Sequence, residues 1–339
     1  MQWWRVVGAI GRFMMRAGVL ILLFVAYQLW GTGLATHRAQ DRLKSEFASQ
    51  LAGTTTTSST ESTTSTTALV PVTAPADLPT PQNGDPIGRI RIPAIGVDFI
   101  GIQGVDIADL KEGPGHFPQT PLPGQPGNVA FAGHRTTYLA PFNRLDELQP
   151  GDEITFDTVQ GTFIYKVDSH ESAPGEAPSG HFIVKPTQVE ILEQDGTDKV
   201  TLMACNPKFS ARERIVVTAT LQSPPAPATP IPAATGDGAV TTDASLDALA
   251  GGDSSAWGPA IFWTALALSI WFLTWLIARR WRARTPASTV ADSDGVAHAE
   301  RAPVPLWHKV VVYAVGAPIF FVVLFVAYEN IARLLPASY

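Results

Sequence analysis

The sequence has only one cysteine in 339 residues. A single cysteine cannot form an intrachain disulfide or supply a cysteine-rich zinc site. Charged residues make up only 16%, a low share for a soluble protein, which suggests that part of the chain lies in lipid. Basic residues do not outnumber acidic ones (24 against 30), which argues against nucleic-acid binding. HExxH, GxSxG and metal-ligand clusters are absent, so we expect no obligatory cofactor and no metal.

Three long apolar runs stand out against this composition. Each is close to the roughly 20 residues that a helix needs to cross the hydrocarbon core of a bilayer. The runs predict transmembrane helices at residues 17–34, 257–278 and 310–328. For the first run the alternative is a cleaved signal peptide, and either interpretation places the middle of the chain outside the cytoplasm.

The placement of arginine and lysine predicts the orientation of these runs. The loop at 279–309 is rich in arginine, whereas no basic residue directly precedes residue 257. The positive-inside rule therefore places this loop and residues 1–16 in the cytoplasm. Residues 35–256 and the tail at 329–339 are then outside, as expected for a multi-pass plasma-membrane protein.

Low-complexity segments separate the apolar runs from a central region of globular composition. Residues 35–84 combine a predicted juxtamembrane helix at 36–53 with a Ser/Thr/Pro-rich stalk, and residues 223–256 form a Pro/Ala-rich linker. Residues 85–222 have a suitable size for one domain. Many short predicted strands with turns between them, including a hairpin around Gln160-Gly161, indicate a mainly β fold and a closed or nearly closed barrel.

Cys205 is the residue that most needs an explanation. It ends the predicted strand DKVTLMAC and is followed by Asn206-Pro207, which places its side chain at the rim of a sheet. An unpaired thiol outside the cell is exposed to oxidation, so a lone one requires a reason. The alternative is a buried cysteine that acts as a small hydrophobic residue. A nucleophilic cysteine reacts as the thiolate and needs a base or imidazolium partner.

His134 is the best candidate for that partner. It ends the predicted strand NVAFAGH and can also lie at a sheet rim, although a surface histidine is the alternative. The remaining histidines are either juxtamembrane or cytoplasmic, or lie in polar turn contexts where we expect them to be solvated. The first group is His37, His298 and His308, and the second is His116, His170 and His181.

A cation is the third group that acyl transfer requires, because the reaction passes through an oxyanion. Arg214 opens the strand IVVTATL, nine residues after Cys205. If the two strands are antiparallel neighbours, Arg214 returns to the rim beside Cys205. Arg212 is the competing candidate, and a solvated surface arginine is the alternative for either.

These residues resemble those of the sortases, membrane-anchored cysteine transpeptidases of Gram-positive bacteria. VTLMACNP is similar to the nucleophile strand of that family, FAGHRTTYLAPFNRLDELQPGDEI to its histidine segment and RIVV to its arginine strand. GHRTTY and CNPKFSARER look most like class E, the actinobacterial housekeeping type. The resemblance covers residues 85–222 and leaves out the two C-terminal apolar runs. One departure is Ala204, where the family usually has threonine.

The resemblance implies an eight-stranded sortase-type barrel with short helices. It implies that Cys205 is the nucleophile, His134 the general acid and base, and Arg214 the oxyanion or substrate-positioning group, with Tyr138 in the substrate pocket. The implied reaction cleaves the Thr-Gly bond of a sorting signal of Leu-Ala-x-Thr-Gly or Leu-Pro-x-Thr-Gly type and passes the acyl group to a peptidoglycan amine. The implied partners are secreted proteins with that signal, a peptidoglycan precursor amine and membrane lipid.

Three other functions use the same features. An extracytoplasmic cysteine protease would need the same catalytic residues, with water in place of the amine. A non-catalytic display or adhesion module on a stalk would tolerate Cys205→Ser. A different cysteine-dependent wall transpeptidase is disfavoured because the Ser-His-Gly-Cys signature is absent.

Overall fold

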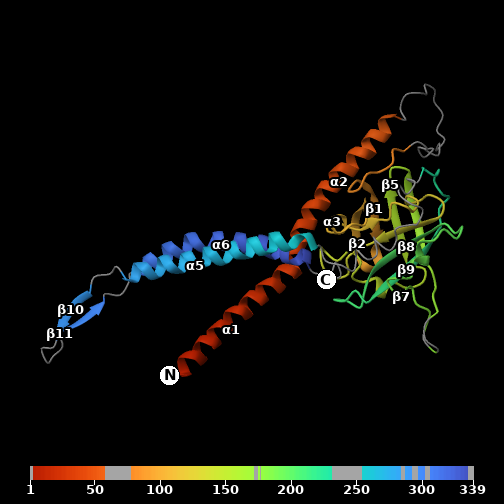
Figure 1. The fold of residues 1–339 in the computed structure, drawn as a ribbon. Coiled ribbons are helices and arrows are strands. Elements are labelled where there is room, and N and C mark those ends of the chain that lie inside the picture. Colours follow the sequence, from red (N-terminus) through yellow and green to blue (C-terminus); the bar gives the residue numbers. More distant parts are fainter. Residues whose placement is uncertain are drawn as a thin grey trace. The chain divides into compact units, whose positions relative to one another are not determined.

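The computed structural model describes residues 3–57, 78–171, 175, 177–230, 254–283, 287–291, 297–301 and 306–334. The chain divides into two compact units, Met1–Gly252 with Leu335–Tyr339, and Asp253–Leu334. The first unit contains a β domain and the second a helical hairpin (Figure 1). The low-complexity part of the predicted stalk, most of the predicted linker and the end of the predicted tail lie outside the described residues.

Eight strands of the first unit close into a barrel. Their order is β6-β5-β1-β2-β3-β4-β8-β9, and pairing of β6 with β9 closes the ring. A ninth strand, β7, pairs with β9 on the edge that faces away from β8. The predicted mainly β barrel is therefore confirmed, and so is the hairpin around Gln160-Gly161, which β5 and β6 form. The strands are β1 (Pro86–Ile92), β2 (Val97–Gln103), β3 (Gly115–His116), β4 (Asn128–Ala132), β5 (Glu153–Thr158), β6 (Gly161–Val167), β7 (Phe182–Val184), β8 (Lys199–Asn206) and β9 (Glu213–Leu221).

Alternation along the strands produces the core of this barrel. In β1, Ile90 and Ile92 are fully buried, whereas Arg89 and Arg91 face outward and pair with carboxylates of neighbouring strands. Inside the barrel, the rings of Phe131 and Phe156 lie 5.3 Å apart. A period of two places alternate side chains on opposite faces of a strand, so this segment could be assigned from its sequence.

Helical segments between the strands of the barrel are short. Helix α3 (Ile107–Leu110) begins with a capping box between Asp106 and Asp109. The segment at 141–148 forms a 3-10 turn at Leu145–Glu147. Phe142, Leu145 and Leu148 of this segment are fully buried in the barrel core. They anchor the turn to the barrel and do not form one face of an amphipathic helix.

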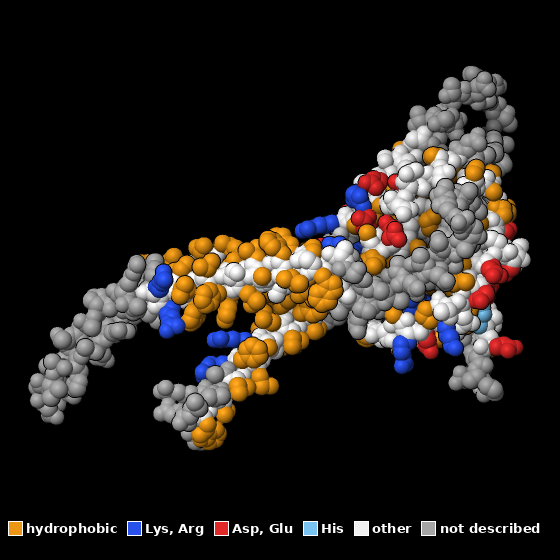
Figure 2. Space-filling model, in the orientation of Figure 1, with side chains coloured by type: hydrophobic (Ala, Val, Ile, Leu, Met, Phe, Trp, Pro, Cys, Tyr) orange, Lys and Arg blue, Asp and Glu red, His pale blue; other side chains and the backbone are white. Residues whose placement is uncertain are grey.

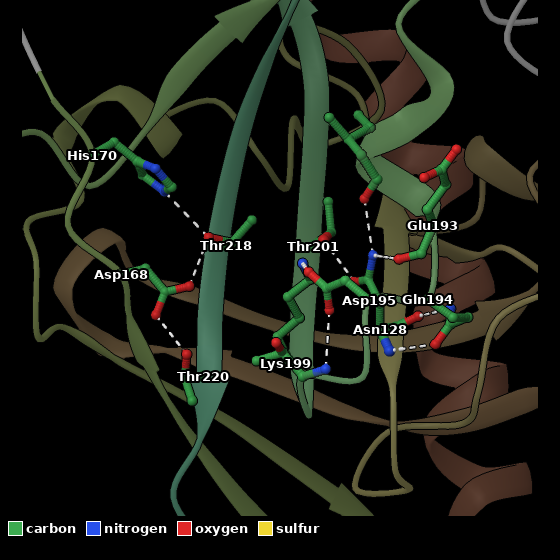
Figure 3. Close-up of polar contacts among 12 residues, drawn as sticks. Asn128, Asp168, His170, Glu193, Gln194, Asp195, Lys199, Thr201, Thr218 and Thr220 are labelled. Atoms are coloured by element: carbon green, nitrogen blue, oxygen red, sulfur yellow. Dashed lines mark hydrogen bonds and ion pairs between the residues drawn. The ribbon is translucent and has the colours of Figure 1, made fainter.

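Polar contacts tie the chain after β6 to the outside of β9 (Figure 3). The carboxylate of Asp168 accepts hydrogen bonds from the hydroxyls of Thr218 and Thr220, both at 2.7 Å. Nε2 of His170 lies 3.2 Å from the hydroxyl of Thr218. On the neighbouring strands, the amide oxygen of Asn128 accepts a hydrogen bond from the Thr201 hydroxyl at 2.7 Å.

A long N-terminal helix is part of the β domain. Helix α1 (Trp3–Ala26) continues through a π-helical segment, Tyr27–Gly31, into α2 (Thr32–Thr57), which extends the predicted juxtamembrane helix at both ends. Leu43 and Phe47 of α2 form a small buried cluster with Ile100 and Ile102 of β2. The helix therefore buries apolar surface that the barrel alone would expose.

Gln40 replaces a missing strand partner at the edge of β2. Its amide nitrogen donates to the carbonyl of Ile100 at 3.0 Å, and its amide oxygen accepts from the Ile100 N–H at 2.8 Å. Strand β3 is short and pairs with β2 only from Ile102 onward. Because buried backbone groups need partners, Gln40 is the residue that joins α2 to the sheet.

The chain after β9 also packs on the barrel. The N–H of Ala226 donates to the Gly124 carbonyl at 2.8 Å, and Gln160 donates to the Pro227 carbonyl at 3.0 Å. Thr229 contacts Gln125. The first residues of the predicted linker are thus held by the domain.

The second unit is a pair of apolar helices, α5 (Trp257–Ala283) and α6 (Leu306–Leu334), which pack against each other. Strands β10 (Ala287–Ala291) and β11 (Ala297–Arg301) form a hairpin in the connection between them. Hydrophobic side chains cover the visible face of both helices (Figure 2). Among the described residues, two helical stretches are long and apolar enough to cross a membrane by length and composition, Trp257–Arg280 and Val310–Leu334.

The prediction of three such helices is therefore wrong for the run at 17–34. This run is divided among α1, the π-helical segment and α2. Its last residues belong to α2, where Thr32 is buried.

The expectation that His116 is solvated is also wrong. It is fully buried in β3, and its ring nitrogens contact the side-chain oxygen of Gln103 and the Pro121 carbonyl, both at 2.8 Å. Burial lowers the pKa of His116 from 6.5 to about 4. His170 and His181 are partly buried, and burial lowers their pKa values as well.

We expect this histidine to make the stability of the domain pH-dependent. The unfolded state takes up a proton below pH 6.5, whereas the folded state does so only near pH 4, so stability is lost as the pH falls between these values. Across this whole pH range, His116 lowers the free energy of unfolding by on the order of 3 kcal/mol. Urea unfolding between pH 7 and about pH 4.5 should show a smaller loss of stability for His116→Gln than for wild type. His37→Gln, on the exposed face of α2, is the matched control, and an equal pH slope in all three proteins would contradict the prediction.

Candidate active site

Cys205 and Arg214 lie directly opposite each other on neighbouring strands. Strands β8 and β9 are antiparallel, and their register pairs Cys205 with Arg214. The side chains of directly opposed residues point to the same face of a sheet, with Cβ atoms about 5 Å apart. Arg212, the competing candidate, precedes β9 and is exposed.

The parallel pairing of β4 with β8 brings His134 to the same rim. Ala132 pairs with Met203, and the N–H of Gly133 donates to the Met203 carbonyl at 3.1 Å. His134 and Cys205 each lie two residues beyond this pair. A side chain at position 133 is excluded, because a Cβ atom there would lie 2.6 Å from the ring of Phe142. Glycine thus permits the close packing that orients the chain into His134.

Cys205 is a buried thiol in the field of two arginines. Its side chain is 8% exposed, and burial raises the pKa of the thiol. The charges of Arg214 and Arg135 act in the opposite direction and lower this pKa. The thiolate is the nucleophilic form of cysteine, so these cations favour the reactive state.

Arg214 is buried, and its guanidinium has more hydrogen-bond donors than its described neighbours accept from. Its side chain is 2% exposed, and Nη1 donates to the carbonyls of Ala211 and Glu213 at 2.9 and 3.0 Å. Among the residues that the structure describes, Nε and Nη2 have no hydrogen-bond partner. Buried polar groups are almost always paired, so two unpaired donors on one guanidinium call for an explanation. A bound carbonyl or oxyanion would satisfy them.

The loop after His134 is tightly folded. Nδ1 of His134 lies 3.4 Å from the hydroxyl of Thr137, and the rings of His134 and Tyr138 lie 4.8 Å apart. Tyr138, Leu139 and Ala140 have consecutive φ values of 53°, 63° and 44°. Left-handed backbone is costly for residues other than glycine and is frequent at functional sites.

Tyr138 also contacts the start of α2 and Lys111, the residue that follows α3. Its N–H lies 3.4 Å from the hydroxyl of Thr32, the first residue of α2. The ammonium of Lys111 lies 5.8 Å from the centre of its ring. The structure therefore places all four predicted site residues in the β domain, with Tyr138 beside His134 and Arg214 opposite Cys205.

Arg135 is a residue of this region that the sequence did not single out. It follows His134 directly and is 3% exposed. Its position next to a candidate catalytic histidine was the one feature of the sequence that could have indicated a role for Arg135. Its burial depends on contacts with residues far away in the sequence, so the sequence pattern alone could not reveal it.

Comparison with known proteins identifies the domain. The sortase domain model matches residues 90–222. This region therefore resembles a sortase domain. The family consists of cysteine transpeptidases, and it accounts for a buried cysteine, a histidine and an arginine at one rim of the barrel.

The chain is similar to two sortases of Streptomyces coelicolor. It is 29% identical to SrtE1 over 62% of this chain and 55% of that protein, so it spans about half the length of SrtE1. It is 24% identical to SrtE2 over 62% of this chain and 80% of that protein. A solved Clostridium perfringens sortase D5 transpeptidase is 25% identical, with a TM-score of 0.41, over 56% of this chain and 99% of that chain.

Proposed function

We propose that this protein is a membrane-anchored cysteine transpeptidase that joins a secreted protein to an amine of the cell wall. The observation that carries the proposal is the pairing of Cys205 with a buried arginine, Arg214, whose Nε and Nη2 have no partner among the described residues. These donors are suited to an oxyanion beside the thiol. His134 follows the end of the neighbouring strand β4 by two residues and is the candidate proton carrier.

In the first half-reaction the Cys205 thiolate attacks the carbonyl carbon of the threonine in a Thr-Gly bond. The carbonyl oxygen becomes an oxyanion, which accepts hydrogen bonds from Nε and Nη2 of Arg214. Protonated His134 gives its proton to the glycine nitrogen, the C–N bond breaks, and the glycine amine leaves. A thioester to Cys205 remains.

In the second half-reaction an acceptor amine attacks the thioester carbonyl. Neutral His134 takes a proton from the attacking nitrogen, and Arg214 again stabilises the oxyanion. The C–S bond then breaks, which restores the thiolate and the protonated histidine. Two acyl transfers replace one difficult direct exchange, which is the general advantage of covalent catalysis.

The substrate that we propose carries a Leu-Ala-x-Thr-Gly or Leu-Pro-x-Thr-Gly signal, and the acceptor is an amine of a peptidoglycan precursor. Tyr138 is the proposed contact with the signal, since its ring lies 4.8 Å from that of His134. Ala204 stands before the nucleophile and is 3% exposed in the barrel core, where it adds no hydroxyl to the site.

The second unit supports a membrane location. Two apolar helices flank an arginine-rich connection, so we propose that both helices cross the plasma membrane and that the connection is cytoplasmic. The sortase domain is then outside the cell, where secreted proteins and wall precursors are present.

The test uses the full-length protein in detergent with a fluorogenic Leu-Ala-x-Thr-Gly peptide, its Leu-Pro-x-Thr-Gly counterpart and an amine acceptor. We expect wild type to form a peptide–amine conjugate, and Cys205→Ala to form none because no thioester can be made. Mass spectrometry of products with and without the amine separates transfer from hydrolysis. Release of the hydrolysed peptide alone, even at high amine concentration, would favour the protease alternative. A folded wild type that cleaves neither peptide would overturn the proposal.

A further inference from the structure

Arg135 is a buried cation beside the nucleophile. Its side chain is 3% exposed, in the loop that directly follows His134. A buried charge is costly unless its donors are paired. The partners of Arg135 therefore indicate what this charge does at its position.

One side of the guanidinium holds the loop that carries His134. Its Nε donates to the Asn143 carbonyl at 2.9 Å, and the Asn143 amide nitrogen donates back to the Arg135 carbonyl at 2.6 Å. Its Nη2 forms an ion pair with Asp146 at 3.0 Å. These contacts close the loop from residue 135 to residue 146 into a fixed shape.

The other side of the guanidinium holds the nucleophile strand. Nη1 donates to the Cys205 carbonyl at 3.1 Å and lies 3.3 Å from the side-chain oxygen of Asn206. Asn206 in turn donates to Glu213 on β9 at 3.0 Å. A single planar group thus connects the end of β8 to the loop of the candidate proton carrier, a task for which arginine is better suited than lysine.

We propose that Arg135 is a positioning residue for the nucleophile. Arg135 holds the end of β8 against the His134 loop and provides a second positive charge beside Cys205. This inference rests on the proposed function. It assigns different tasks to the two buried arginines. Every nitrogen of the Arg135 guanidinium contacts protein, whereas Arg214 keeps two donors for substrate. The lowering of the thiol pKa by Arg135 is consistent with this division.

Other charged groups face this position and stay unchanged in the test. Asp146 also lies 3.8 Å from the ammonium of Lys208. His181 is within the electrostatic range of Arg135, and Arg214 acts on the thiol directly. A substitution at 135 removes one of these charges and leaves the others in place.

The test follows alkylation of the thiol by iodoacetamide as a function of pH, on the full-length protein in detergent. Cys205 is the single cysteine, so alkylation reports on this site alone and needs no substrate. Arg135→Met keeps the length of the side chain and removes the charge, and Arg135→Lys keeps the charge. Arg144→Met is the matched control, because Arg144 lies in the same loop but is exposed and pairs with Glu147.

We expect the pH midpoint of alkylation to rise in Arg135→Met, with about tenfold slower alkylation at neutral pH, since a nearby opposite charge shifts a pKa by roughly one unit or more. The pH midpoint of Arg135→Lys should lie close to that of wild type, because the positive charge is kept. The midpoint of Arg144→Met should equal that of wild type. An unchanged midpoint in Arg135→Met, with only a lower melting temperature, would show a merely structural role and overturn the inference. A wild type that shows the expected alkylation profile but forms no peptide–amine conjugate would instead refute the proposed function.

Discussion

Replacing Arg214 with alanine is expected to reduce kcat for conjugate formation about 10²- to 10³-fold, the usual effect of removing an oxyanion donor. Nε and Nη2 of this guanidinium, which have no partner in the described part of the chain, are the donors that the oxyanion would use. Arg214→Lys should recover little activity, because an ammonium cannot present the same fork of donors from the same position. The measurement is steady-state kinetics with the fluorogenic peptide and the amine.

The same substitution should leave the fold intact. Among the residues that the structure describes, Arg214 is bonded through Nη1 alone, to the carbonyls of Ala211 and Glu213. Removing a buried charge whose other donors have no partner there relieves a desolvation cost. Thermal unfolding of Arg214→Ala should thus stay close to that of wild type. Arg212→Ala is the matched control, since Arg212 is exposed and should not affect kcat. Loss of activity in Arg212→Ala with retention in Arg214→Ala would reverse the assignment.

Leu43→Ala is expected to destabilise the β domain by about 2–5 kcal/mol, the range for a buried leucine. Leu43 is fully buried against Ile100 and Ile102 of β2. Loosening α2 also affects the site, because Thr32 at the start of this helix contacts the N–H of Tyr138. Urea unfolding of the full-length protein, followed by fluorescence, measures the change in stability.

Leu51→Ala is the control for this prediction. It makes the same chemical change on the same helix, at a side chain that is 38% exposed, and should cost about 0.5 kcal/mol or less. Equal destabilisation by the two substitutions would mean that α2 does not rely on its contact with β2. A fragment limited to residues 85–222 lacks both this contact and the Gln40 hydrogen bonds, so activity assays need the longer chain.

Local pattern was sufficient for the strands that cross the barrel. The apolar alternation of β1 and the apolar runs of β4, β8 and β9 are visible in the sequence because each depends on neighbouring residues. The same patterns located Cys205, His134 and Arg214 at strand ends. Strands β3 and β7 have only two and three residues, too few for any periodicity to show.

Contacts between distant residues account for the expectations that failed. The turn context of His116 is polar, but the barrel wall buries its side chain completely. The run at 17–34 is apolar enough for a membrane helix, but its last residues begin α2, which packs on β2. Composition reports the hydrophobicity of a segment and does not report which surface covers it.

Local sequence patterns identify the longer strands, the two C-terminal apolar helices and the order of histidine, cysteine and arginine along the chain. The folded barrel is needed to see that Cys205 faces Arg214, that the parallel pairing of β4 with β8 brings His134 to the same rim, and that Arg135 connects β8 to the His134 loop. The physical reason is that side-chain periodicity is a local property of the chain. The pairing of β4 with β8 and the contact of Arg135 with Cys205 join segments that are about 70 residues apart and meet only when the barrel closes.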